Sequence, residues 1–161
     1  MRLFRQTRLG RWDDVFERIT AEVKKLQTSP GTYHSIPIEV SPGELIDKVT
    51  ILQIKSERVQ DPAKLRNIHA ELAMLTSACD GTLPPSEEIS TLAAELKEVN
   101  ELIWDVEDAL RLQEREGRFD AEFIELARSV YRTNDRRAAI KRRINEYYSA
   151  QFMEEKDHPA Y

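Results

Sequence analysis

Three basic side chains fall on one stripe of a predicted helix, where together they could bind an anion. At about 100° per residue, Lys48, Lys55 and Arg58 lie on the same strip as Glu44 and Asp47. One interpretation is a solvated edge, in which Glu44 and Lys48 pair one helical turn apart. The other is a groove in which the two lysines and the arginine bind a phosphate or a carboxylate.

A second polar stripe runs along the next long helical segment. Asn100, Trp104, Glu107 and Arg111 follow one another at steps of four, three and four residues. An indole flanked by an amide, a carboxylate and a guanidinium is what a small polar pocket needs. Alternatively, Trp104 only widens the core and bonds its indole N–H to a neighbour.

The last helical segment carries polar residues where its apolar face should continue. The face that begins at Phe123 goes on to Asn134, Arg137 and Lys141. Burying an unpaired amide or charge costs several kcal/mol, so these groups must be partnered or solvated. Either the helix breaks at Thr133–Asp135, whose residue types cap helices, or it continues and supplies a buried polar site. We favour the unbroken helix, because no glycine or proline enforces a break.

These stripes predict one concave site, on which polar groups from three helices converge. No catalytic residue can be assigned within it. The predicted ligand-binding residues are Lys48, Lys55, Arg58, Trp104, Glu107, Arg128, Tyr131, Asn134 and Arg137.

Other kinds of chemistry find little support in the sequence. No pair of cysteines or histidines has zinc-ligand spacing, and there is neither a glycine-rich phosphate loop nor a G-x-S-x-G turn. Cys79 precedes Asp80 near a helix end, where the negative charge should raise the thiol pKa and disfavour a nucleophile. We therefore predict no metal and no cofactor.

The elements that position these residues are predicted to be all helical. Apolar periodicity indicates helices over residues 11–27, 42–60, 62–81, 86–116 and 121–148, with a loop at 28–40 that is extended near residues 36–40. The clearest start is Ser41, an N-cap followed by Pro42 and by Glu44, which would complete a capping box. The prediction is an antiparallel bundle of four to five helices, residues 36–161, preceded by a helical extension and loop, residues 1–35.

The 86–116 helix carries a heptad seam, and this seam bears on the oligomeric state. Its apolar positions are Ile89, Leu92, Leu96, Val99, Ile103, Val106 and Leu110. The seam and the N-terminal helix offer more apolar surface than a small bundle needs. We therefore predict a homodimer.

Composition narrows the class of protein. With 33% charged residues and a net charge of −5, the chain suits a packed helical protein and gives no general nucleic-acid signal. No apolar run approaches the roughly 20 residues that span a bilayer, and a single cysteine fits a reducing compartment. We therefore predict a cytoplasmic protein with neither a nucleic-acid partner nor a membrane span.

Three sequence blocks resemble an uncharacterised bacterial family. The first is SPGELIDK at residues 41–48 with IKSER at 54–58, and the second is FIELARSVY at 123–131 with Asn134-Asp135. A weaker block contains Asn100, Ile103-Trp104 and Glu107-Asp108. The resemblance covers about residues 36–161. It implies a setting beside, or fused to, glycosyltransferases and surface-polysaccharide genes, but no mechanism.

Two functional hypotheses follow. The first is a non-enzymatic helical binding or accessory module, which binds a small anionic ligand or a partner protein such as a glycosyltransferase. The alternative is a small helical-bundle enzyme that holds an anionic metabolite (a phosphosugar, a sugar nucleotide or a carboxylate) with basic side chains. Cations fixed in place can stabilise a transition state without a nucleophile, as in helical chorismate mutases, to which the 44–58 helix has a loose likeness.

Overall fold

The computed structural model describes residues 12–13, 15–20, 36–155 and 157. The chain divides into two compact units, Met1–Ile38 and Glu39–Tyr161. In the first unit, residue 13 and residues 15–20 are helical, with Val15 buried and Phe16 exposed. The remainder of the helix predicted over 11–27 lies outside the described residues.

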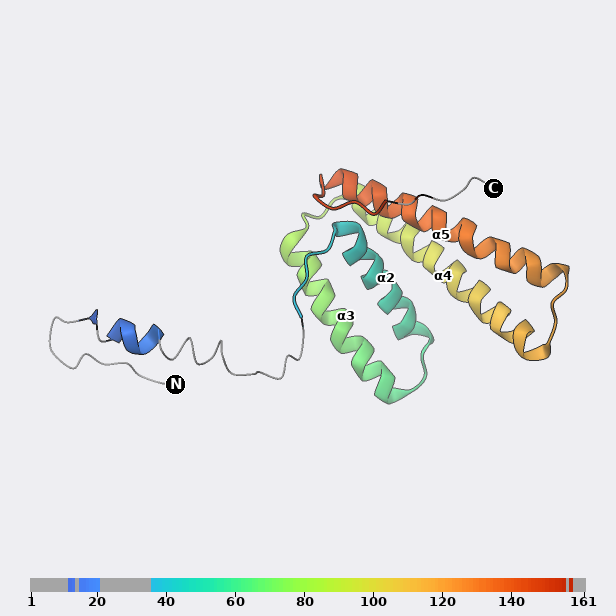
Figure 1. Cartoon of the computed structure of the whole chain (residues 1–161), viewed down its shortest axis with the longest axis horizontal. Helices are drawn as coiled ribbons and strands as arrows, with labels where there is room; N and C mark the ends of the chain where they lie inside the picture. The colour runs from blue at the N-terminus through green and yellow to red at the C-terminus, as the bar shows by residue number, and fades with distance from the viewer. Residues whose placement is uncertain (1–11, 14, 21–35, 156, 158–161) are drawn as a thin grey trace. The chain divides into compact units, whose positions relative to one another are not determined.

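The second unit consists of four helices (Figure 1), which are α2, α3, α4 and α5, spanning Pro42–Arg58, Pro62–Thr82, Glu87–Glu116 and Ala121–Tyr147. The described residues contain no strand, and residues 36–41 form no regular element. The predicted all-α bundle is confirmed. The last helix is unbroken through Thr133–Asp135, as predicted.

Side-chain caps fix where these helices begin. Oγ of Ser41 accepts a hydrogen bond from the Glu44 amide at 3.3 Å, and Oδ1 of Asp61 accepts one from the Ala63 amide at 2.8 Å. The first bond is one half of the predicted capping box; the Glu44 carboxylate accepts a hydrogen bond from Lys141 on α5. That contact ties the start of α2 to α5.

α2 is the central helix of the unit. It contacts α3, α4 and α5, whereas α4 and α5 pack against each other as a long hairpin. The main core combines residues from α2, α4 and α5, namely Ile46, Ile89, Leu92, Leu96, Val99, Ile140 and Ile144. Each such side chain contributes about 1.5–3 kcal/mol when buried. α3 has no fully buried residue and covers α2 from the outside.

The heptad seam of α4 is used largely inside the chain. Ile89, Leu92, Leu96 and Val99 are at most 8% exposed, and Ile103 packs partly buried against the same core. The first half of the seam is therefore not a free surface for a second chain. In Figure 1 the far end of the α4–α5 hairpin extends beyond the end of α2. Within the described part of the chain, no helix is long and apolar enough to cross a membrane.

Candidate functional site

A cavity of about 290 Å³ lies where the second half of α2 meets the middle of α4 and α5. We call it the Trp104 cavity. Its apolar wall consists of Ile51, Ile54 and Ile103. Its polar lining consists of Lys55, Asn100, Trp104, Glu107, Asp108, Arg111 and Arg137.

Arg137 is held at the cavity by a buried carboxylate. Its Nε donates to Oδ1 of Asp47 at 2.8 Å, and its Nη2 bonds to Oδ2 of the same residue. The Asp47 side chain is 3% exposed and that of Arg137 is 27% exposed. The hydrogen bond to Asp47 raises the pKa of Arg137, against the opposing effect of burial, so the guanidinium is fixed as a cation.

The same carboxylate belongs to a closed hydrogen-bond network. Nδ2 of Asn100 donates to Oδ1 of Asp47 at 2.9 Å and lies 3.0 Å from Oγ1 of Thr50. The Thr50 hydroxyl in turn donates to the Asp47 carbonyl at 2.8 Å. With Arg137, the network joins three helices and leaves no oxygen of the Asp47 carboxylate without a partner. A fully satisfied buried network of this kind fixes the positions of its members.

Lys55 differs from the other cations that line the cavity. Arg137 is paired with Asp47, and Arg111 is paired with Glu107 at 2.6 Å and with Asp108 at 3.1 Å. The Lys55 side chain is half-buried, and among the residues that the structure describes its ammonium forms no ion pair. A half-buried ammonium without a counterion is a favourable position for an anionic group.

Trp104 lies beside a charged pair that Arg58 of α2 forms with Asp105 of α4. The Arg58 guanidinium lies 5.8 Å from the centroid of the Trp104 ring and also bonds to Asp105. That hydrogen bond raises the pKa of Arg58, so the cation persists beside the ring. Glu107 and Arg111 line the same cavity and pair with each other within α4.

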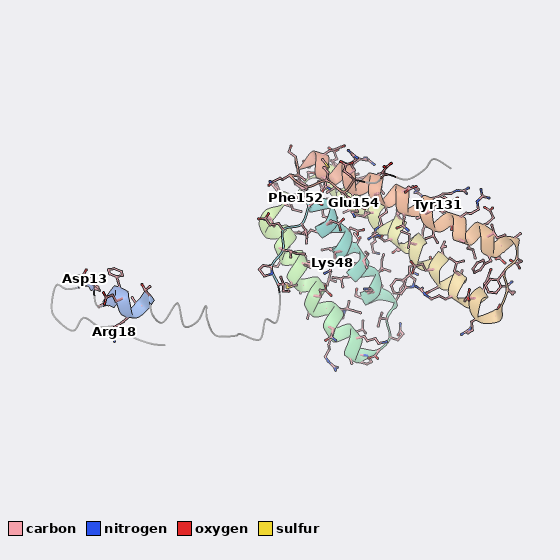
Figure 2. All side chains as sticks on the ribbon, viewed as in Figure 1. Asp13, Arg18, Lys48, Tyr131, Phe152 and Glu154 are labelled. Carbon is pink, nitrogen blue, oxygen red and sulfur yellow. The ribbon has the colours of Figure 1, made fainter. Side chains whose placement is uncertain are left out.

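A small polar cavity of about 80 Å³ adjoins Arg137 on its other side and is also lined by Asn134, Ala138, Lys141 and Glu154. Lys141 bonds to Glu44 and, at 2.6 Å, to Glu154, which Figure 2 labels in the segment after α5. Burial lowers the pKa of Lys141, but the bonds to Glu154 and Glu44 outweigh it, so the net shift is upward.

The start of α2 approaches α5 closely enough to require glycine. The Gly43 amide donates to Oδ1 of the buried Asn145 at 2.7 Å. A Cβ at residue 43 would lie 2.6 Å from the Lys141 carbonyl oxygen and 2.9 Å from Oδ1 of Asn145. This contact sets the distance between α2 and α5, and hence the width of the space that contains Arg137.

Residues 36–160 match a family described as a family of unknown function, DUF6165. The chain belongs to this family. The predicted resemblance to an uncharacterised family is confirmed at that level. Because the matched range contains α2 to α5, the Trp104 cavity lies wholly in the part of the chain that defines membership. No curated protein and no solved structure matches the chain.

Within this family domain, the structure gathers most of the predicted site residues. Lys55, Trp104, Glu107 and Arg137 line the Trp104 cavity, and Arg58 reaches it through the face of Trp104. Asn134 lines the small adjacent cavity together with Arg137, its side-chain amide donating to the Val130 carbonyl at 3.1 Å.

Three predicted residues lie elsewhere. Lys48 pairs with Glu71 on α3 at 2.9 Å, whereas Glu44 and Asp47 from the same stripe face α5. Arg128 pairs with Glu125 on its own helix at 2.9 Å. Tyr131 is 37% exposed on α5, and Figure 2 shows it well apart from Lys48. None of the three lines the Trp104 cavity.

Sequence reasoning missed the role of Asp47. The helical pattern puts Asp47 on the stripe with Lys48, yet the residue is only 2% exposed. The signal was available in α2 itself, whose apolar residues lie on both sides of the polar stripe. A polar residue between two apolar faces of a central helix is buried when both faces are covered.

Proposed function

We propose that this chain is a binding module that takes a small anionic ligand in the Trp104 cavity. The observation that carries the proposal is Lys55, a half-buried cation without an ion-pair partner in the described structure. It shares the cavity with Arg137, which the buried Asp47 holds in place. A cation without a counterion beside a second cation that Asp47 holds in place favours an anion at this point.

The lining also suggests the remainder of the ligand. A cavity of about 290 Å³ is at the small end of ligand sites, so it suits a metabolite rather than a polymer. The indole of Trp104 and the Ile103 side chain offer apolar contact, and Glu107 and Asp108 offer acceptors for hydroxyl groups. An anion that carries hydroxyls, such as a sugar phosphate or a hydroxy acid, matches both features.

The biological setting is proposed from the sequence blocks alone. Their resemblance implies surface-polysaccharide or glycosyltransferase pathways, which makes sugar nucleotides and phosphosugars the first ligands to test. A glycosyltransferase partner and a homodimer belong to the same proposal.

An enzyme that acts on such an anion is the second candidate. It is favoured by the carboxylate of Glu107, which lines the cavity beside Trp104. Lys55 and Arg137 could stabilise negative charge as it develops in a transition state. The ion pair between Glu107 and Arg111 at 2.6 Å favours binding over catalysis, because it engages the carboxylate that would act on the ligand.

Thermal-shift measurements with sugar nucleotides, phosphosugars and hydroxycarboxylates test the proposal. We expect one class of compound to raise the melting temperature of the native chain. The same compounds should leave the melting temperature of Lys55→Gln unchanged. Lys48→Gln is the matched control, since it removes a lysine from the same helix outside the cavity. Proton NMR of the bound compound after incubation distinguishes the two candidates, because only an enzyme converts it. If no class shifts the melting temperature, or both variants respond alike, the cavity is not the binding site.

A further inference from the structure

The chain turns back on itself where α5 ends. Ser149 has a φ of 51°, in the left-handed region, and the Ala150 amide donates to the Asn145 carbonyl at 2.8 Å. A left-handed residue at this position commonly ends a helix and reverses the chain. Figure 1 shows the next residues running back along α5. We call residues 149–155 the return segment.

Glu154 is the residue that ties the return segment to the bundle. Its carboxylate accepts a hydrogen bond from the Lys141 ammonium at 2.6 Å. The neighbouring pair, Glu155 with Arg142 at 3.6 Å, joins two exposed side chains and contributes little. Phe152, which Figure 2 labels on the same segment, is 50% exposed. Among the described contacts of the return segment, the bond between Glu154 and Lys141 is therefore the strongest.

The cation that holds Glu154 is buried, whereas Glu154 itself is accessible. The Lys141 side chain is 9% exposed and also bonds to Glu44 of α2, but the Glu154 side chain is 42% exposed. Removing a partner from a buried charge costs on the order of a few kcal/mol. Departure of Glu154 is therefore favourable only when another anion takes its place on Lys141.

The small polar cavity beside this contact has room for such an anion. Its volume is about 80 Å³, and two of its five lining residues, Arg137 and Lys141, carry a positive charge. This size suits a single small group and is well below that of a metabolite site. We propose that the small polar cavity binds a carboxylate from solution, which displaces Glu154 from Lys141 and thereby releases the return segment.

Charge favours exchange over simple addition of an anion. Lys141 and Arg137 carry two positive charges here, and the carboxylates bonded to them, Glu44, Glu154 and Asp47, carry three negative charges. A further anion would increase this negative excess, whereas exchange for Glu154 leaves it unchanged. A carboxylate also reproduces the group that Lys141 already binds.

The tether of Glu154 sets how strongly a carboxylate must compete. A short flexible tether gives a millimolar effective concentration, so a carboxylate with no other contact should compete only above that range. A molecule with a second anionic group could compete better, because Arg137 also lines the Trp104 cavity. That last step rests on the proposed function, but the exchange at Lys141 does not.

Chemical rescue tests whether the cavity accepts a carboxylate from solution. Glu154→Ala should lower the melting temperature by about 4 °C, because the buried ammonium loses a partner. About 200 mM sodium acetate should restore at least half of that loss, compared with sodium chloride at the same ionic strength. Glu155→Ala removes the neighbouring carboxylate and should respond to the two salts alike. If acetate and chloride act equally on Glu154→Ala, the proposal is wrong.

Hydrogen exchange on the native chain tests the displacement itself. In about 200 mM sodium acetate, amides of residues 150–155 should exchange about threefold faster or more than in sodium chloride, because release exposes them to water. Amides of residues 96–100, in the buried part of α4, are the internal control and should not change. Exchange in the return segment that is the same in both salts would overturn the displacement.

Repeating the rescue without Lys55 separates this proposal from the proposed function. Acetate bound at Lys55 in the Trp104 cavity could also raise the melting temperature. The difference between acetate and chloride in Glu154→Ala should therefore persist in the double variant Lys55→Gln/Glu154→Ala. If it disappears, acetate acts at the Trp104 cavity, and the exchange at Lys141 is wrong while the anion site at Lys55 stands.

Discussion

Nε of Arg137 on α5 lies 2.8 Å from Oδ1 of Asp47 on α2, and 90 positions separate the two residues in the sequence. The contact does two things. It ties α2 to α5 through a carboxylate that is almost fully buried, and it holds a cation at the Trp104 cavity. Stability and the proposed binding function therefore share this residue pair.

Removing only Arg137 should destabilise the fold more than replacing both Arg137 and Asp47 with apolar residues. Arg137→Met leaves the Asp47 carboxylate buried with only Asn100 as a side-chain donor, and we expect it to lower the free energy of unfolding by about 3 kcal/mol. The double variant Asp47→Leu/Arg137→Met should regain most of that loss, because no buried charge remains. Urea unfolding of Arg137→Met, Asp47→Leu and the double variant measures the coupling. If Arg137→Met were as stable as the native chain, the burial of Asp47 would be contradicted.

The close approach of α2 to α5 predicts a strong effect of one methyl group. Gly43→Ala should destabilise the fold by about 1–3 kcal/mol, because the nearest atom is a backbone oxygen that cannot rotate away. Gly81→Ala is the matched control, since no atom lies within 4 Å of its added Cβ. Gly81 lies in the last turn of α3, so alanine there should be neutral or stabilising. Thermal denaturation of the two variants compares them directly, and equal melting temperatures would argue against the contact.

Gln113 is a position where the native residue is not optimal. Its side chain is 3% exposed, and among the described residues its Oε1 is a buried oxygen without a hydrogen-bond partner. Gln113→Met keeps the length of the side chain and removes the unsatisfied amide. We expect a gain of about 1 kcal/mol in the free energy of unfolding, measured in urea. A loss of stability would mean that the amide has a partner in solution.

Lys141 should make stability depend on alkaline pH. Its folded pKa is raised above the unfolded value of about 10.4, so the folded state holds the proton more tightly. The contribution is therefore fully present below that pH and is lost as pH rises through the folded pKa. The stability difference between the native chain and Lys141→Met should be constant from neutral pH to about 10 and shrink above it. A difference that grows with pH would contradict the sign of the shift.

The helices were predictable because their ends carry local signals. Ser41-Pro42 and Asp61-Pro62 cap and start helices without help from the rest of the fold. The unbroken α5 was predictable for a related reason, since no glycine or proline interrupts it.

The partners of the polar residues were not predictable in the same way. Lys48 and Lys55 share one stripe of α2, yet the first faces Glu71 on α3 and the second faces the Trp104 cavity. A helical projection gives the direction of a side chain, whereas its neighbours depend on how the helices cross. The heptad seam of α4 likewise does not reveal its partner. Its pattern suits a helix of a second chain as well as α5, which covers it here.

Binding at the Trp104 cavity can be measured on Trp104 itself. In the Trp12→Phe background, we expect the fluorescence of Trp104 to change saturably with a sugar nucleotide, a sugar phosphate or a hydroxycarboxylate at low salt. Lys55→Gln should weaken that binding about tenfold or more, because it removes the unpaired cation, and Lys48→Gln should leave it unchanged. If no such anion produces a saturable change, or Lys55→Gln binds as tightly as Lys48→Gln, the Trp104 cavity is not an anion site.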